Sequence, residues 1–319
     1  MCSLFGLIDF RNSLTQRQKN RMVSVLAEEC EVRGTDATGI AYNYQDTLRI
    51  YKRPLPAHKM WFRIPKDVNI IMGHTRMTTQ GSEKKNYNNH PFAGRCEKSF
   101  ALAHNGVLYN DTDLRKKYDL PSTYIETDSY IAVQLLEQQK ALHLQSLKEM
   151  AEQVEGSFCF TVLDEENNVY FVKGDNPLCI YKFNGYYLYA STEEILQKAL
   201  KKLNLDAPYE KVSINCGEIL KIDNQGFQEW EEFTFSHFML GHFPPTRYTG
   251  YLSDTTLLDE IMAYAQSIGV SPDDITTLLE FGYDESEIEE MLYDPIGFQT
   301  CLQEVYETEL DFYYESLCM

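Results

Sequence analysis

The residue after the initiator methionine is a cysteine, and its position gives it a candidate role in catalysis. Loss of Met1 would leave Cys2 as the first residue, with an α-amino group within one residue of the thiol. Such an amine has a reference pKa of about 7.7 to 8.0, so near neutral pH it can accept the thiol proton. Cys2 is therefore a candidate nucleophile, although a lone cysteine near a terminus is more often an incidental thiol.

A second candidate is the pair Asn105-Gly106, at the end of an apolar run that begins at Phe100. Hydrolysis of an amide places negative charge on the carbonyl oxygen, and one preorganised donor to that oxygen contributes about 3 kcal/mol. The asparagine side chain offers N–H donors, and glycine lets a backbone N–H approach closely. The alternative for these two residues is a strand that ends in an Asn-Gly turn.

Two charged residues are suited to hold the ends of an amino acid. Arg76 closes a hydrophobic strand in the run Gly73-His-Thr-Arg-Met-Thr-Thr-Gln-Gly81, where its guanidinium could bind an α-carboxylate in bidentate fashion with help from Thr79. Asp128, in Glu126-Thr-Asp-Ser129, could pair with the α-ammonium of the same molecule. The competing interpretations are a solvated arginine at a strand end and a helix N-cap at Thr127 or Asp128.

Taken together, these pieces resemble a known family. Cys2 with Phe5-Gly6, the run Arg33-Gly-Thr-Asp-Ala-Thr-Gly39, and the Gly-His-Thr-Arg, His-Asn-Gly and Glu-Thr-Asp motifs occur in the order and approximate spacing of the class II glutamine amidotransferase domain. That domain is the glutaminase half of glucosamine-6-phosphate synthase and of amidophosphoribosyltransferase. The resemblance extends over about residues 2 to 230, and its specificity lies in the joint match, because each motif is weak alone.

The resemblance implies both a fold and a set of roles. The fold is an α+β, four-layer αββα sandwich of the N-terminal-nucleophile hydrolases. Cys2 would be the nucleophile with its own amine as base, and no metal or cofactor is called for. Asn105 and Gly106 would form the oxyanion hole. The residues that would hold glutamine are Arg76, Thr79 and Asp128. Arg33 would support the site from its loop, and Met77 would lie in the loop that covers glutamine.

The sequence also departs from the family pattern. Sugar-aminating relatives tend to have tryptophan at the position of Met77 and histidine at that of Gln80, and asparagine synthetases usually have proline where this chain has Thr35. We find no Ser-Gly-Gly-x-Asp loop of ATP pyrophosphatases, and no phosphoribosyl or sugar-isomerase domain follows the amidotransferase region. We therefore expect a separate synthase to accept the ammonia.

Three functions are compatible with these residues. The leading hypothesis is a glutaminase that cleaves the side-chain amide through a Cys2 thioester. The second is a stand-alone amidohydrolase for γ-glutamyl or other amides, and the third is a non-enzymatic glutamine sensor or scaffold. The complete set of Cys2, Asn105 and Gly106 argues against the third.

Hydrophobic patterning predicts the elements that position these residues. Period-two or continuous apolar runs predict strands over 3–10, 37–44, 48–53, 69–74 and 100–108, two hairpins over 157–173 and 179–190, and a β segment over 212–222. Periodicity and end signals predict a helix capped by Thr15 and helices over 113–118, 127–139, 144–154 and 193–202. Strands in blocks, with helices between them, favour a layered α+β fold over an alternating parallel one.

Charge divides the chain into two segments. The net charge is −19, and residues 240–319 hold 17 acidic residues against the single basic Arg247, which leaves 28 basic and 31 acidic residues in 1–239. We predict an amidotransferase domain at 1–239 and, at 240–319, a linker over 241–254 followed by an acidic helical extension. The extension is not suited to nucleic acid; it would solubilise the chain or bind a basic partner. Its helical hairpin also faintly resembles ubiquitin-associated domains.

Cysteine usage and the lack of targeting signals complete the expectations. The eight cysteines are dispersed, with no C-x-x-C motif or metal-ligand spacing, so we expect reduced thiols. No run approaches the roughly 18 apolar residues of a membrane span, and the apolar stretch after Cys2 is too short for a signal sequence. We therefore expect a cytoplasmic protein. The oligomeric state is left open.

Overall fold

The computed structural model describes residues 2–235 and, further on, residues 258, 261, 262, 265, 266, 270–283, 285–292, 298, 299, 301–303, 305 and 306. The chain separates into two compact units, Met1–Phe238 and Met239–Met319, which are treated one at a time. Among the described residues, no helix is long and apolar enough to cross a bilayer.

Two antiparallel sheets form the centre of the first unit. Within the described residues, the first sheet has seven strands in the order β11-β9-β10-β1-β4-β2-β3, and the second has six in the order β13-β12-β8-β7-β6-β5. The strands of the first sheet are β1 Ser3–Ile8, β2 Ala37–Tyr44, β3 Thr47–Arg53, β4 Ile70–Arg76, β9 Cys179–Lys182, β10 Tyr187–Ala190 and β11 Glu210–Val212. Those of the second are β5 Phe92–Arg95, β6 Ser99–Leu108, β7 Gly156–Asp164, β8 Val169–Lys173, β12 Glu218–Ile222 and β13 Gln228–Glu232.

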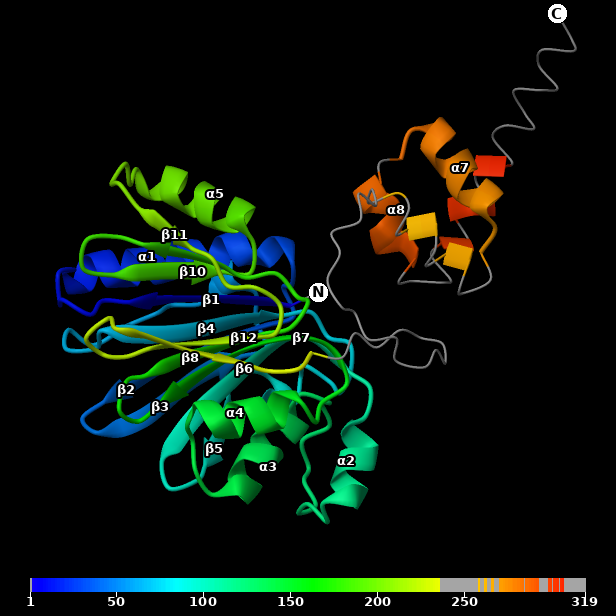
Figure 1. Cartoon of the computed structure of the whole chain (residues 1–319). Helices are drawn as coiled ribbons and strands as arrows, with labels where there is room; N and C mark the ends of the chain where they lie inside the picture. Colours follow the sequence, from blue (N-terminus) through cyan, green and yellow to red (C-terminus); the bar gives the residue numbers. More distant parts are fainter. Residues whose placement is uncertain are drawn as a thin grey trace, which may run out of the picture. The chain divides into compact units, whose positions relative to one another are not determined.

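Helices cover the outer face of each sheet (Figure 1). One apolar cluster joins α1 and α5 to the first sheet, a second joins α2, α3 and α4 to the second sheet, and a third fills the space between the sheets. This arrangement is the four-layer αββα sandwich that the sequence predicts. The helices are α1 Gln16–Glu29, α2 Asp111–Lys117, α3 Tyr130–Gln139, α4 Leu144–Ala151 and α5 Glu193–Leu203, with short 3-10 turns η1 Cys30–Val32, η2 Ala57–Lys59 and η3 Asn86–Asn88.

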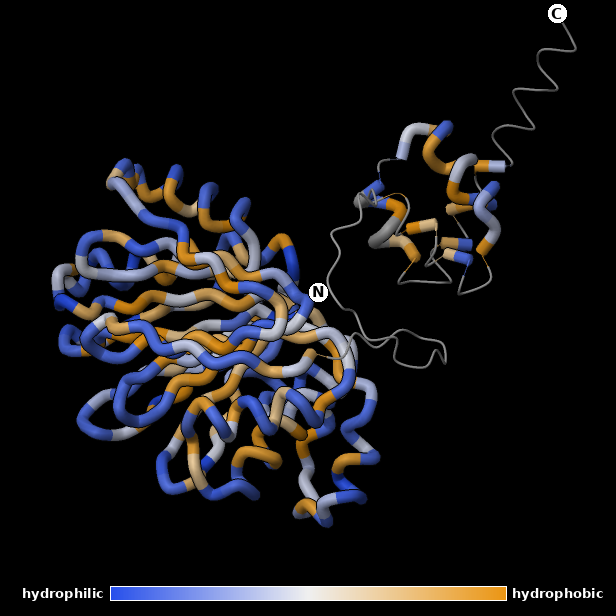
Figure 2. The backbone as a smooth tube through the Cα atoms, viewed as in Figure 1, coloured by the Kyte–Doolittle hydropathy of each residue, from blue (hydrophilic) through white to orange (hydrophobic). Residues whose placement is uncertain are grey.

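Local signals explain where these helices begin. Thr15 caps α1 through a complete capping box with Gln18, and Thr192 caps α5 by accepting a hydrogen bond from the backbone N–H of Ile195. Figure 2 shows the alternation of hydrophobic and hydrophilic residues along α5, whose buried positions face the sheet. Because one face of each helix is apolar, packing on the sheet supplies most of its stability.

The sequence prediction was wrong at three strands. The expected β segment over 212–222 is two strands, because β11 pairs with β9 in the first sheet and β12 pairs with β8 in the second. The chain passes from one sheet to the other at Gly217, which has a φ of +86°. The short edge strands β5 and β13 were not predicted; β13 alternates half-buried and exposed residues and lacks a clear apolar period.

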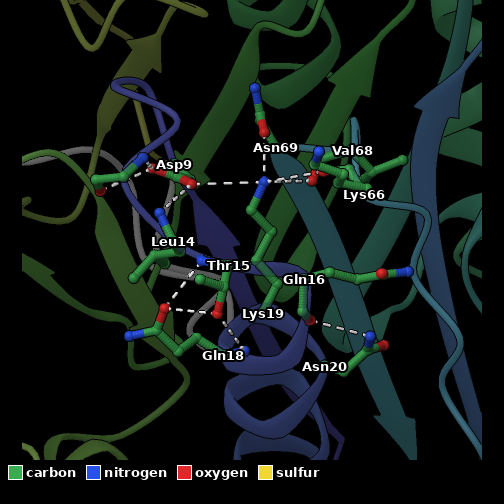
Figure 3. A network of polar contacts seen from close by, with 11 residues as sticks. Asp9, Leu14, Thr15, Gln16, Gln18, Lys19, Asn20, Lys66, Val68 and Asn69 are labelled. Carbon is green, nitrogen blue, oxygen red and sulfur yellow. Dashed lines mark hydrogen bonds and ion pairs between the residues drawn. The ribbon is translucent and has the colours of Figure 1, made fainter.

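A buried ion pair anchors the end of β1 that lies away from Cys2 (Figure 3). Lys19 of α1 lies 3.5 Å from Oδ2 of Asp9, and both side chains are almost fully buried. The ammonium also donates to the carbonyl of Val68 at 2.9 Å and to Oδ1 of Asn69 at 2.5 Å. Asp9 accepts hydrogen bonds from the backbone N–H groups of Ser13 and Leu14. The pair therefore connects β1, α1 and the segment that leads into β4.

The second unit has a small helical core of its own. Ser271 caps α7 Pro272–Phe281, as its Ser-Pro-Asp-Asp signal predicts, and α8 Glu285–Leu292 follows the left-handed Gly282. The expected linker at 241–254 lies outside the described residues, as do parts of the helical extension predicted within 240–319. Apolar side chains pack together from α7, α8 and the flanking described residues, namely Ile261, Ala265, Ile275, Leu278, Ile288, Leu292, Phe298, Leu302 and Val305.

Candidate active site

Strand alternation brings the candidate residues to one end of the space between the sheets. In β1, Leu4 and Ile8 belong to the core between the sheets, whereas Phe5 and Leu7 face the helical layer. Even-numbered positions therefore face the second sheet, and Cys2 continues that series. By the same argument, Arg76 follows Ile70 and Met72 of β4.

The second sheet contributes its residues from β6. There the odd-numbered Ala101 and Ala103 lie in the core between the sheets, which gives Asn105 the same orientation. The predicted strand over 100–108 is confirmed, and the alternative of an Asn-Gly turn is excluded, because β6 continues to Leu108 and pairs with β7 throughout.

Cys2 is buried and held on both sides. Its thiol donates to the carbonyl of Met77 at 3.5 Å, and its own carbonyl accepts a hydrogen bond of 3.0 Å from Nε of Arg33. Burial raises the pKa of the Cys2 thiol, and the charge of Asp128 raises it further, while Arg76 opposes the effect. The thiol is therefore protonated near neutral pH and needs a base to become a nucleophile.

Arg76 is buried, with its guanidinium held mainly by oxygen atoms of neutral groups. Nη1 donates to Oδ1 of Asn89 at 2.7 Å, and Nη2 donates to the carbonyls of Gln80 at 2.5 Å and Gly81 at 3.2 Å. In the part of the chain that the structure describes, no carboxylate lies within ion-pair distance of it. Burial lowers the pKa of Arg76, whereas the neighbouring Cys2 and Asp128 raise it.

Asp128 lies just before α3 and is also buried. Its Oδ2 accepts a hydrogen bond of 2.6 Å from the backbone N–H of Leu108 in β6, and Ser129 approaches Oδ1 at 3.4 Å. Its own backbone N–H donates to Oε1 of Gln80 at 2.9 Å. The helix begins at Tyr130 rather than at Thr127, and its N-cap Ser129 makes no side-chain cap, so the N-cap interpretation of Thr127 and Asp128 is wrong.

Asn105 has an unpartnered buried side chain, and Gly106 has a backbone conformation that favours glycine. The side chain of Asn105 is fully buried, and neither its oxygen nor its nitrogen has a hydrogen-bond partner in the described protein. Gly106 has a φ of +141°, and a Cβ there would lie 1.9 Å from the carbonyl oxygen of Ser157. Only glycine fits at this position, and an unpartnered buried amide is costly unless it has a use.

The loop after β4 lies at the exposed edge of the site. The side chain of Met77 is 50% exposed, although its carbonyl accepts the hydrogen bond from Cys2. Thr79 is also exposed, and no hydrogen bond to it is found within the described residues. The structure thus places Arg33 and Met77 in hydrogen-bond contact with Cys2 and connects Arg76 to Asp128 through Gln80. The roles of these residues, and that of Thr79, stay predictions.

Sequence reasoning missed three residues that organise the site. Gln80 was noted only as a departure from the family pattern, yet it connects Arg76 to Asp128. Asn89 binds the guanidinium from the loop before β5, and His74 donates across the sheets to the carbonyl of His104. The polar run Asn88-Asn89-His90 before a proline was a signal for the loop that contains Asn89. No feature of the sequence indicates that His74 contacts His104.

Other features of the first unit lie away from this end. A surface cavity of about 380 Å³ opens between β3, β5 and β6, near the ends of those strands opposite to the candidate site. In the described parts of the chain, no three His, Cys, Asp or Glu side chains gather as a metal site.

Comparison with known proteins agrees with this architecture. Residues 74–198 match the model of a family described as a glutamine amidotransferase domain, a segment that contains Arg76, Asn105, Gly106 and Asp128 but not Cys2. Glutamine phosphoribosylpyrophosphate amidotransferase of Bacillus subtilis, solved with ADP and GMP, shares the fold with a TM-score of 0.58 and 21% identity, over 74% of this chain and 50% of that one. The shared fold and the matched segment are those of a glutamine amidotransferase domain.

The sequence relatives of this chain include aminotransferases whose names contain glutamine and fructose-6-phosphate. Glutamine–fructose-6-phosphate aminotransferase of Bacillus cereus is 28% identical over 262 residues, which are 75% of this chain and 42% of that protein. The enzyme of the same name from Listeria innocua is 29% identical over 235 residues, or 71% of this chain and 36% of the relative. The matched segment, these relatives and the shared fold are together consistent with a class II glutamine amidotransferase domain. It spans less than half the length of these curated relatives.

Proposed function

We propose that this protein hydrolyses the side-chain amide of glutamine to glutamate and ammonia, with Cys2 as the nucleophile. The observation that carries the proposal is the buried pair Arg76 and Asp128, which Gln80 connects, next to a Cys2 thiol that donates to the carbonyl of Met77, the residue after Arg76. A free amino acid has one carboxylate and one ammonium to satisfy that pair. Its side-chain amide would then lie at the thiol.

The first half of the reaction forms a thioester. After removal of Met1, the α-amine of Cys2 takes the thiol proton, and the sulfur attacks the δ-carbon of glutamine. The oxyanion receives hydrogen bonds from the side-chain amide of Asn105 and the backbone N–H of Gly106. The C–N bond then breaks as the α-ammonium returns its proton to the leaving nitrogen, and ammonia departs.

The second half regenerates the enzyme. Water gives a proton to the α-amine and attacks the thioester carbonyl, and a second tetrahedral intermediate uses the same two donors. Its collapse releases glutamate and returns the thiol. In this scheme Arg76 and Thr79 hold the α-carboxylate, Asp128 holds the α-ammonium, and Arg33 fixes the backbone of the nucleophile. Met77 covers the bound substrate.

The ammonia acceptor is a separate part of the proposal. The matched relatives are named as aminotransferases, so we propose that a synthase takes up the ammonia. The activity test below uses free glutamine and is independent of that partner. Co-purification of the full chain with a synthase would support the second part, and recovery of the chain alone would count against it.

The test of the nucleophile compares three variants, two with a cysteine replaced by alanine and one with a blocked N-terminus. The change Cys2→Ala should abolish glutamate release, whereas Cys216→Ala, which alters an exposed thiol, should leave it intact. A non-cleavable N-terminal extension should be nearly as damaging as Cys2→Ala, because it removes the α-amine. Undiminished turnover in the Cys2→Ala protein would refute the mechanism.

A substrate panel separates the alternatives. Turnover of γ-glutamyl amides in preference to glutamine would indicate a stand-alone amidohydrolase on the same site. Glutamine binding without turnover, measured by calorimetry on the protein with a free Cys2 terminus, would instead indicate a sensor. The glutaminase proposal requires the kcat/KM for glutamine to be higher than that for the γ-glutamyl amides.

A further inference from the structure

The two halves of the proposed reaction centre stand on different sheets. Cys2 precedes β1 in the first sheet, and Asn105 and Gly106 belong to β6 in the second. The layer between the sheets is largely apolar, with Leu4, Met72 and Ala103 among its members. Apolar contact is not directional, so it holds the sheets together without fixing the position of the oxyanion donors to a fraction of an ångström.

A hydrogen bond between two histidine residues provides a directional contact between the two sheets next to these donors. Nε2 of His74 in β4 lies 2.9 Å from the backbone carbonyl oxygen of His104 in β6, and both residues are buried. A carbonyl oxygen only accepts, so the proton must be on Nε2 of His74. The acceptor belongs to the peptide group that enters Asn105, and the donor is two residues before Arg76.

The imidazole of His74 is itself held in place. Its ring lies against that of His90, with centroids 4.3 Å apart, and His90 packs edge-on against Phe92 at 4.4 Å. Burial lowers the pKa of His74 to about 3, so the ring is neutral and a single tautomer donates at neutral pH. Nδ1 of His74 has no partner among the described residues, which leaves the bond to His104 as the polar contact of this ring.

We propose that His74 is a positioning residue that sets the oxyanion hole of the second sheet against the nucleophile of the first. This inference rests on the proposed function. His74 touches neither the nucleophile nor the substrate in this scheme; it acts through the His104–Asn105 peptide group. A displacement of about 1 Å at a reacting centre costs on the order of 10²-fold in rate. Loss of this bond should therefore lower kcat and spare KM, because the clamp formed by Arg76 and Asp128 is untouched.

The experiment compares two substitutions at His74 with one elsewhere. His74→Phe keeps a flat ring and removes the donor, whereas His74→Gln offers an amide N–H at about the same reach. We expect kcat for glutamine to fall on the order of 10²-fold in His74→Phe, with KM within about twofold of the wild-type value. His74→Gln should recover at least about tenfold of that loss. His58→Phe, at an exposed histidine, is the control and should match the wild type.

A second readout separates positioning from general damage. Alkylation of Cys2 by iodoacetamide needs a free thiol and no oxyanion hole, so its rate in His74→Phe should equal that of the wild type. If His74→Phe does not fold, His74→Asn, whose shorter amide cannot reach the carbonyl, replaces it in the comparison with His74→Gln. A kcat within threefold of the wild type in the donor-free variant overturns this inference alone. A parallel fall in kcat and in the alkylation rate also overturns this inference. A wild-type protein that releases no glutamate overturns the proposed function as well.

Discussion

Nε of Arg33 donates a hydrogen bond of 3.0 Å to the backbone carbonyl of Cys2. This contact holds the main chain of the candidate nucleophile from the loop between α1 and β2, while the opposite face of the residue is held by Met77. A hydrogen bond from a charged group contributes about 1.5 to 3 kcal/mol. We expect Arg33→Ala to reduce kcat for glutamine by about tenfold or more, measured as glutamate release at saturating substrate.

The matched control for Arg33 is Arg11→Ala. Arg11 also makes a side-chain contact, a 2.8 Å bond to Asn184, but at an exposed position in a turn region away from Cys2. Equal losses in the two variants would show that the effect of Arg33 is not specific to the nucleophile.

Gln80 connects the two charged residues of the clamp. Its main-chain carbonyl accepts from Arg76, and its side-chain oxygen accepts from the backbone N–H of Asp128. Gln80→Ala removes the second bond, which at about 1 kcal/mol should raise KM for glutamine roughly fivefold with little change in kcat. Gln145→Ala, at an exposed position of α4, should leave both constants as they are. An unchanged KM in Gln80→Ala would show that the loop keeps its position without this contact.

Three buried histidines predict how stability depends on pH. Burial lowers the pKa of His74 to about 3, that of His90 well below 6.5 and that of His104 below 6.5. Between these values and about 6.5 the unfolded chain binds more protons than the folded one, so stability falls as pH falls below 6.5. Each such group adds up to about 1.4 kcal/mol per pH unit to the slope.

Substitution of one histidine isolates this term from acid effects on carboxylates. Both ring nitrogens of His90 lack partners among the described residues, so His90→Phe removes a titrating group and no known bond. Urea unfolding of this variant at pH 7, 6 and 5 should give a flatter slope than the wild type. His58→Phe should not change it, and equal slopes in all three proteins would contradict the assignment of a depressed pKa to His90.

The Asp9–Lys19 pair predicts a loss of folding stability without a direct role in chemistry. Removal of one partner leaves an uncompensated buried charge, which costs about 3 to 5 kcal/mol. Asp9→Asn and Lys19→Met should each lower the free energy of unfolding by about that amount, as measured by urea denaturation. The double variant should be more stable than the sum of the single effects predicts. Glu194→Gln, which breaks an exposed pair with Lys198, should leave the midpoint unchanged.

Much of the fold could be predicted because local signals agree with the tertiary structure. The capping box of Thr15 and the hairpin turn at Asn184-Gly185 depend on neighbouring residues alone. The strand β5 has only four residues, too few for a periodicity signal. The switch between sheets at Gly217 depends on β9 and β8, which lie far back along the chain and which a periodicity argument does not contain.

The candidate site divides in the same way. Cys2, Arg76, Asn105, Gly106 and Asp128 could be proposed from residue chemistry and motif order, and their roles stay predictions. The contributions of Gln80 and His74 could not, because each is defined by one hydrogen bond to a residue 30 or more positions away. Chemical type identifies residues that react, whereas residues that hold others in place become visible only in three dimensions.

The alternation of β1 makes the placement of its first residues discrete rather than continuous. A shift of one residue would turn Cys2 toward the helical layer, where Ser3 now donates to the sulfur of Cys30. The next shift that restores the faces is two residues, or about 7 Å, too far for the thiol to meet the same partners. Shifts of one residue and of two residues in the register of β1 therefore both separate the thiol from its partners, and Cys2 meets them in a single register of β1 against β4 and β10.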